Sequence, residues 1–182
     1  MITNWNLINF RSNTRKQHLD RFENICRENH WVLKGERVIR ANTKPYVIMY
    51  QNTLIGYYAI DEVSGKQHCF WGFYILPQYR GKGYGTIALL KVAFTMFKMK
   101  QTNCLFCHCH KDNGIAKHIY LKYGYLYGKD ERLYDSFVSC QYPQINDYGE
   151  YTIVFLQKVW GDSNYILKGE LENVFNLHTI QK

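Results

Sequence analysis

The chain lacks an apolar run long enough to cross a membrane. Its hydrophobic stretches fall well short of the roughly 20 residues that a transmembrane helix needs. The first residues, Met1-Ile2-Thr3-Asn4-Trp5-Asn6, also lack the basic segment followed by an apolar stretch that marks a secretory signal. We therefore expect a soluble, cytoplasmic protein.

The cysteines do not form the framework of a secreted, disulfide-rich domain. There are six of them, and three lie at positions 104, 107 and 109 within one predicted strand. Reduced thiols are the better interpretation. The same segment, Cys104 to His110, carries ligand types that suit zinc, but residues 107 and 109 face opposite to 104, 108 and 110 on a strand. No single face offers four ligands, so we expect no metal and predict that Cys107 and Cys109 pack as weak hydrophobes.

Repeats, low-complexity tracts and linkers are also missing, which favours one domain. A chain of 182 residues with 46% hydrophobic content is long enough for a well-packed core. We expect this domain to cover residues 1–160 and a C-terminal extension, residues 161–182, to pack on it or to form a homodimer contact. The extension has apolar residues that fit one helical face: Ile166, Leu167, Leu171, Val174 and Phe175.

The net charge of +8 comes from basic residues that are scattered along the sequence. A basic helix, an aromatic-rich RNA motif and a zinc finger are all lacking, so nucleic-acid binding has little support. The charge still favours an acidic macromolecule or a nucleotide-linked amine over a small cationic ligand.

The hydrophobic pattern predicts alternating strands and helices. In chain order we expect a strand at Leu7 to Phe10, a helix from Arg15 to Asn29, a three-stranded meander (46–50, 54–60 and 67–76), a largely buried helix from Gly83, a strand at 104–110, a helix at 113–123, a short strand from Tyr125 and a long strand at 151–159.

A glycine-rich loop follows the last strand of the meander. It reads Arg80-Gly81-Lys82-Gly83-Tyr84-Gly85-Thr86 and leads directly into the helical pattern. Glycines let the backbone turn tightly and approach a ligand, and the unpaired N–H groups at a helix start attract an anion. The sequence therefore predicts a phosphate-carrying ligand here, although an ordinary strand-to-helix turn is the alternative.

A second motif lies about thirty residues downstream. It reads Asn-x-x-Ala-x-x-x-Tyr-x-x-x-Gly-aromatic from Asn113 to Tyr125. Together with Arg-x-x-Gly-x-Gly after a strand that ends at a proline, this pair of motifs resembles the GNAT superfamily of acyl-CoA-dependent N-acyltransferases. The matching motifs cover about residues 67 to 125.

The resemblance implies an α/β fold of the α+β kind. Its mixed, mostly antiparallel sheet has about six to seven strands with splayed middle strands, and helices flank the sheet. It also implies acetyl-CoA as co-substrate, bound by the loop and by the strand edge from Phe73 to Leu76, with an N–H near Ile75 polarising the carbonyl. The implied cofactor-binding residues are Phe73, Ile75, Leu76, Arg80, Gly81, Lys82, Gly83, Tyr84, Gly85, Thr86, Asn113 and Ala116.

The same resemblance makes Tyr120 the general acid that protonates the leaving thiolate, while Asn113 holds the cofactor arm. A tyrosine of pKa about 10 stays protonated at neutral pH and can supply that proton. Tyr120 lies about two helical turns after Asn113, so the two residues can contact one cofactor. The alternative interpretation of Tyr120 is a core aromatic.

The resemblance implies an N-acetyltransferase acting through a direct ternary complex, and it leaves the acceptor amine open. The candidate bases are Glu62, His68, His108 and His110, and no motif selects among them. An acidic pocket for a cationic amine would draw on Glu62, Asp130, Glu131, Asp135 and Asp147, and the segment 130–149 is expected to shape specificity. The alternative function is a catalytically inactive, coenzyme A-binding module that acts through a protein or nucleic-acid partner.

Overall fold

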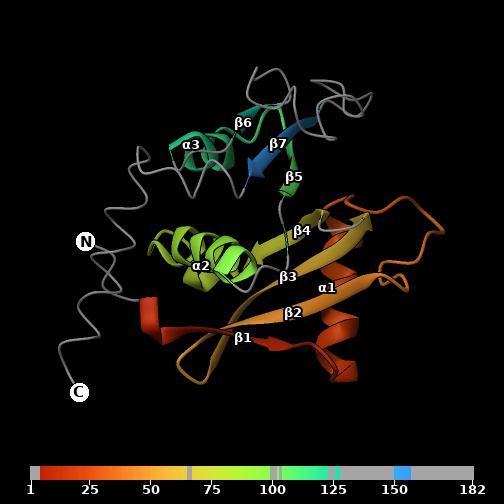
Figure 1. The fold of residues 1–182 in the computed structure, drawn as a ribbon. Helices are drawn as coiled ribbons and strands as arrows, with labels where there is room; N and C mark the ends of the chain where they lie inside the picture. The colour runs from red at the N-terminus through yellow and green to blue at the C-terminus, as the bar shows by residue number, and fades with distance from the viewer. Residues whose placement is uncertain are drawn as a thin grey trace. The chain divides into compact units, whose positions relative to one another are not determined.

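The computed structural model describes residues 5–64, 67–98, 102, 104–122, 126–127 and 150–156. The chain divides into two compact units, one of residues 3–95 and one of residues 96–182 with the first two residues. The helices and strands of each unit are labelled in Figure 1.

The unit of residues 3–95 is built on antiparallel strands that pair in chain order. They are β1 (Ile8–Ser12), β2 (Thr43–Tyr50), β3 (Thr53–Ser64) and β4 (Gln67–Ile75), with short 3-10 turns η1 (Trp5–Leu7) and η2 (Pro77–Tyr79). The predicted meander is confirmed. β3 runs past its expected end at residue 60, because Glu62 and Ser64 still pair with His68 and Gln67.

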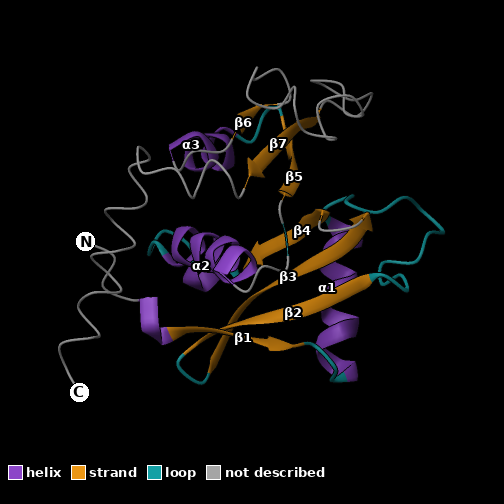
Figure 2. Ribbon diagram, viewed as in Figure 1, coloured by secondary structure: helices purple, strands orange, loops and turns teal. Residues whose placement is uncertain are grey.

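Two helices cover this sheet (Figure 2). On α1 (Lys16–Glu28), Phe22 is fully buried and its ring stacks 5.9 Å from that of Tyr57. α2 (Tyr84–Lys98) starts over the other face, where the Tyr84 ring lies 4.7 Å from that of Tyr50. Side chains alternate between the two faces along a strand, so one sheet supports both helices. The prediction that α2 is largely buried is confirmed.

A β-bulge bends β4 before it reaches the glycine loop. Ala59 pairs with Trp71 and Tyr57 with Tyr74, so the β4 strand carries one extra residue between these two pairs. Gly72 lies in this bulge with φ +61°, and a Cβ there would come within 2.7 Å of the Phe22 ring. Only glycine fits both the left-handed backbone and the close approach of α1.

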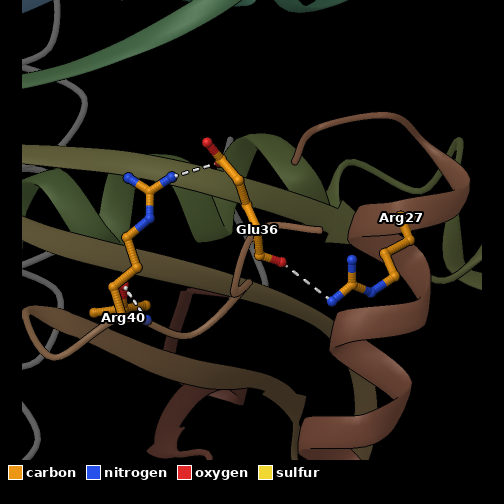
Figure 3. A network of polar contacts seen from close by, with 4 residues as sticks. Arg27, Glu36 and Arg40 are labelled. Carbon is orange, nitrogen blue, oxygen red and sulfur yellow. Dashed lines mark hydrogen bonds and ion pairs between the residues drawn. The ribbon is translucent and has the colours of Figure 1, made fainter. Parts of the chain in front are cut away.

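The segment that joins α1 to β2 is tied down by arginines (Figure 3). Arg27 of α1 donates to the backbone carbonyl of Glu36 at 3.3 Å, and Arg40 bonds the Glu36 carboxylate at 3.1 Å. The backbone N–H of Arg40 in turn donates to the Thr43 hydroxyl at 3.2 Å. The two arginine side-chain contacts are exposed and contribute little free energy, whereas the bond to Thr43 is partly buried.

The second unit contains three strands and a helix. Its elements are β5 (Cys104–His110), α3 (Gly114–Lys122), β6 (Leu126–Tyr127) and β7 (Glu150–Leu156), and β7 pairs with both β5 and β6. The expected strand 104–110 is confirmed. The segment 130–149 and the extension 161–182 lie outside the described residues, so the predictions for them stay predictions.

Two sequence-based expectations concern the cysteines and the membrane. The five described cysteines are all free thiols, which agrees with the expected reduced state: Cys26, Cys69, Cys104, Cys107 and Cys109.

In the described part of the chain, no helix combines the length and the apolar character needed to cross a bilayer.

Candidate active site

The glycine loop has the backbone that its sequence predicted. Gly81 and Gly83 have φ values of +73° and +77°, a region that side chains other than glycine rarely adopt. Open space surrounds both, because a Cβ added at either would meet no atom within 4 Å. The N–H of Ile87 donates to the Gly83 carbonyl, so the preceding N–H groups start the helix without intrahelical partners. This arrangement suits an anion such as a phosphate group.

The end of β4 presents backbone groups away from β3. The Leu76 N–H donates to the Ile55 carbonyl at 2.9 Å, while Ile75 lies opposite Gly56. In an antiparallel pair, bonded and non-bonded residue pairs alternate, so the Ile75 N–H and carbonyl point away from β3. This is the edge that the sequence analysis assigned to the acyl arm, from Phe73 to Leu76.

Arg80 folds back onto this strand end. Its Nε donates to the Ile75 carbonyl at 2.9 Å, and its guanidinium lies 4.8 Å from the ring centroid of Tyr74. The Trp31 ring lies 6.1 Å from the Tyr74 ring. Lys82 places its ammonium 5.9 Å from the Tyr79 ring centroid. Two cations therefore lie close to the open loop, and each is held near an aromatic ring.

The second motif begins at the N-terminus of α3. Asn113 precedes the helix and its Oδ1 accepts the Ala116 backbone N–H at 3.1 Å, which makes Asn113 the N-cap. The helix therefore starts one residue later than predicted. Its end lies at Lys122, and Gly124 and Tyr125 of the motif lie outside the described residues.

Tyr120 is buried in the second unit, with 8% of its surface exposed. Its side chain is hydrogen-bonded to that of Cys107 on β5. Burial raises the pKa of the Cys107 thiol to about 12, while the contact with Tyr120 acts in the opposite direction. The Tyr120 ring therefore packs as a core aromatic does, and its hydroxyl also has a polar neighbour.

The four candidate bases occupy two regions. Glu62 and His68 are cross-strand partners at the start of β4, about 20 Å along the strand from Ile75. His108 and His110 are exposed at the end of β5. His110 accepts the Asp112 backbone N–H through Nδ1 at 3.3 Å, and its ring lies 3.5 Å from the Asp112 carboxylate. The remaining acidic candidates, Asp130, Glu131, Asp135 and Asp147, lie outside the described residues.

Metal binding finds no support in the described ranges, where no group of three or more His, Cys, Asp or Glu side chains could hold an ion. Along β5 the odd positions 105, 107 and 109 are buried, whereas His108 and His110 are exposed. The two faces therefore separate the thiols at 107 and 109 from the imidazoles, as the strand period predicts.

Some neighbours of the predicted site residues were missed by sequence reasoning. Trp31 and Tyr74 lie beside Arg80, and Cys107 lies beside Tyr120. These contacts join residues from different elements, so no local pattern could reveal them. The bulge at Gly72 had a sequence signal, because a glycine inside an apolar strand often marks one.

Comparisons with known proteins agree with these features. The acetyltransferase (GNAT) family model matches residues 3–125. A search of curated proteins gave no significant match. Spermidine N-acetyltransferase from Vibrio cholerae, in complex with CoA and spermine, is similar in structure with a TM-score of 0.65 at 14% identity, covering 86% of this chain and 99% of that chain. A dodecameric structure of spermidine N-acetyltransferase from the same organism has a TM-score of 0.61 at 16% identity, covering 87% and 99%.

These structural likenesses establish the fold, and the family model covers about two thirds of the sequence, including both motifs. The mixed α/β architecture expected from the sequence is confirmed. The chain belongs to the GNAT family of acetyltransferases.

Proposed function

We propose that this protein is an N-acetyltransferase that passes the acetyl group of acetyl-CoA to an amine in a direct ternary complex. One observation carries the proposal: an outward-facing backbone edge at Ile75 leads into an open loop with glycines of positive φ, and then into a helix start. A thioester arm and a pyrophosphate need these two features in this order. The reaction uses no covalent acyl-enzyme and takes place in the cytoplasm.

The loop from Gly81 to Thr86 binds the pyrophosphate of acetyl-CoA through backbone N–H groups. The partial positive charge at the start of α2 adds to this attraction. Lys82 and the outer nitrogens of Arg80 supply charge from the side, and the Arg80 Nε stays on the Ile75 carbonyl. The residues present therefore fit the diphosphate, with the backbone contributing most of the binding.

The Ile75 N–H polarises the acetyl carbonyl, and Tyr120 donates its proton to the sulfur as the carbon–sulfur bond breaks. Asn113 uses its Oδ1 to cap α3 and offers its amide N–H groups to the cofactor arm. These roles for Asn113 and Tyr120 rest on their positions in the family motif.

The attacking amine must lose a proton. An amine with the pKa of lysine, about 10.4, is neutral in only about one molecule in 2,500 at pH 7. Glu62 and His68 lie too far along β4 from Ile75 to accept this proton directly, so the histidines at the end of β5 or a water relay remain as candidates.

Two classes of acceptor amine are considered for the proposed reaction. The similar Vibrio cholerae enzyme is a spermidine N-acetyltransferase, which makes polyamines one acceptor class to test. The charge of +8 opposes the approach of a polycation and favours an acidic macromolecule or a nucleotide-linked amine. Both classes therefore belong in the same experiment.

The test follows isotopically labelled acetyl groups. The protein is incubated with labelled acetyl-CoA and, in separate reactions, spermidine, an acidic peptide with a free N-terminus and an aminoacylated RNA. We expect label in at least one of these amines. If no amine is labelled and the protein nevertheless binds coenzyme A, it is instead a binding module.

A further inference from the structure

Arg80 pairs with the strand edge that the proposed function assigns to the acyl arm. The peptide group between Ile75 and Leu76 is bonded on both sides. Its N–H donates to the Ile55 carbonyl at 2.9 Å, and its carbonyl accepts the Arg80 Nε at 2.9 Å. β3 supplies the first bond, and Arg80 stands in place of a neighbouring strand for the second. The end of β4 is therefore held from both sides.

The turn after β4 brings Arg80 back to this position. The Arg80 backbone N–H donates to the Pro77 carbonyl at 3.1 Å, which closes the short turn η2 and returns the chain toward β4. The guanidinium then lies 4.8 Å from the ring centroid of Tyr74, and a cation over an aromatic ring is attracted to it. The turn and the ring together hold the Arg80 Nε on the Ile75 carbonyl.

We propose that Arg80 is a positioning residue, which sets the register of the acyl arm by occupying the Ile75 carbonyl. The inference rests on the proposed function, which places the thioester at this edge. An extended ligand can pair with a strand edge through the donors or the acceptors of that edge. Because Arg80 takes the acceptor, the Ile75 N–H is the group of this residue that pairs with the arm.

The register decides whether the acetyl oxygen meets a donor. The arm of acetyl-CoA carries amide N–H groups as well as carbonyls, so an Ile75 carbonyl without a partner would accept one of these N–H groups and shift the acetyl group along the edge. A charged donor at 2.9 Å outcompetes a neutral amide for this oxygen. The acetyl oxygen then lies on the Ile75 N–H, which polarises the carbonyl and stabilises the charge that develops there.

This role differs from the attraction between the Arg80 charge and the diphosphate. A positive charge near the loop attracts phosphate whichever atom carries it, whereas the bond to Ile75 needs a donor at the Nε position. Lys82 is the other cation beside the loop, and its ammonium lies near a different ring, that of Tyr79. Substitution of Lys82 therefore removes charge and leaves the bond between Arg80 and Ile75 in place.

The test compares Arg80→Gln, Arg80→Met and a matched control, Lys82→Met. The amide nitrogen of glutamine occupies the same place along the side chain as the arginine Nε, so Arg80→Gln keeps a donor for the Ile75 carbonyl and loses the charge. Arg80→Met loses both the donor and the charge. Arg80 and Lys82 are exposed, so none of these changes removes a core residue.

Three measurements follow the two ends of the cofactor. Calorimetry with ADP, which shares the diphosphate of coenzyme A and lacks its arm, reports on the phosphate end. The infrared carbonyl band of bound, isotopically labelled acetyl-CoA reports on the polarisation of the thioester. Turnover of acetyl-CoA is measured with the amine that takes up label in the test of the proposed function.

We expect all three variants to weaken ADP binding by about two- to fivefold, because each loses one positive charge. The kcat of Arg80→Met should lie about tenfold below that of Arg80→Gln, with similar KM values for acetyl-CoA. Arg80→Met should also lose most of the carbonyl band shift that the wild type produces on binding. Arg80→Gln should keep that shift, and so should Lys82→Met.

Equal kcat values and equal carbonyl bands in Arg80→Gln and Arg80→Met would overturn this inference and leave the proposed function intact. Loss of the band shift in Lys82→Met would also overturn it, since charge alone would then set the polarisation. A wild type that binds coenzyme A, but neither turns over acetyl-CoA nor shifts its carbonyl band, overturns the proposed function and this inference together.

Discussion

At the scale of single residues, His68 shows how burial controls charge. Its side chain is 8% exposed, and within the described part of the chain its Nδ1 has no hydrogen-bond partner. Burial lowers the pKa of His68, Lys44 acts in the same direction, and Glu62 opposes the shift. The folded protein therefore favours the neutral imidazole.

This burial predicts a loss of stability in mild acid. The unfolded chain takes up the His68 proton first as the pH falls through its ordinary pKa of about 6.5, so unfolding becomes easier there. We expect the free energy of unfolding, measured in urea at about pH 7 and pH 5, to fall more in the wild type than in His68→Gln. The exposed His30 provides the control, because His30→Gln should keep the wild-type pH dependence. If the free energy of unfolding fell by the same amount in His68→Gln as in the wild type, the account would be contradicted.

Gly83 is the residue on which the loop depends. An alanine at φ +77° is strained by about 1–2 kcal/mol, and its methyl group would enter the space assigned to phosphate. We expect Gly83→Ala to weaken coenzyme A binding by at least about tenfold in calorimetry. Gly35→Ala, at φ +91° and also in open space but outside the loop, should bind coenzyme A as the wild type does.

At the scale of elements, the bulge at Gly72 links β4 to α1. Alanine there meets both an unfavourable φ and the Phe22 ring at 2.7 Å, which is too close for any real contact. We predict that Gly72→Ala lowers the free energy of unfolding by about 2–4 kcal/mol. In Gly35→Ala only the backbone strain remains, and we expect about 1 kcal/mol. Similar losses in both variants would show that the packing against Phe22 contributes nothing.

Element boundaries show what the sequence could predict. The strand 104–110 has its predicted bounds because turn residues end the apolar run at both sides. α3 begins after Asn113 because that residue uses its side chain to cap the helix. The end of β3 was predicted too early, since Val63 and Ser64 have no local signal for the strand pairing that continues there. Pairing depends on both strands, and local composition does not encode it.

The candidate site also combines a feature that the sequence could predict with a contact that it could not. The glycines at 81 and 83 predicted a backbone that bends with positive φ, because no other residue adopts it so readily. The contact between Cys107 and Tyr120 joins a strand to a helix. The sequence could show two suitable residues but not that they are neighbours.

At the scale of the whole molecule, we propose that residues 1–160 form the acetyltransferase domain and that 161–182 are an extension. The family model ends at residue 125, well before the extension. We therefore expect a chain that ends at residue 160 to keep the coenzyme A affinity of the full chain. Sedimentation of both proteins checks whether the extension forms the proposed homodimer contact. Loss of folding, detected by circular dichroism, would contradict this domain boundary.

The central claim is that Tyr120 supplies the proton in acetyl transfer from acetyl-CoA. The most direct test compares wild type and Tyr120→Phe in turnover of acetyl-CoA with the labelled amine, together with the Kd for coenzyme A. The account predicts that turnover falls by about 100-fold or more while the Kd for coenzyme A is unchanged. The reason is that phenylalanine fills the buried site but lacks the hydroxyl group that donates the proton. Equal turnover in the two proteins would contradict it.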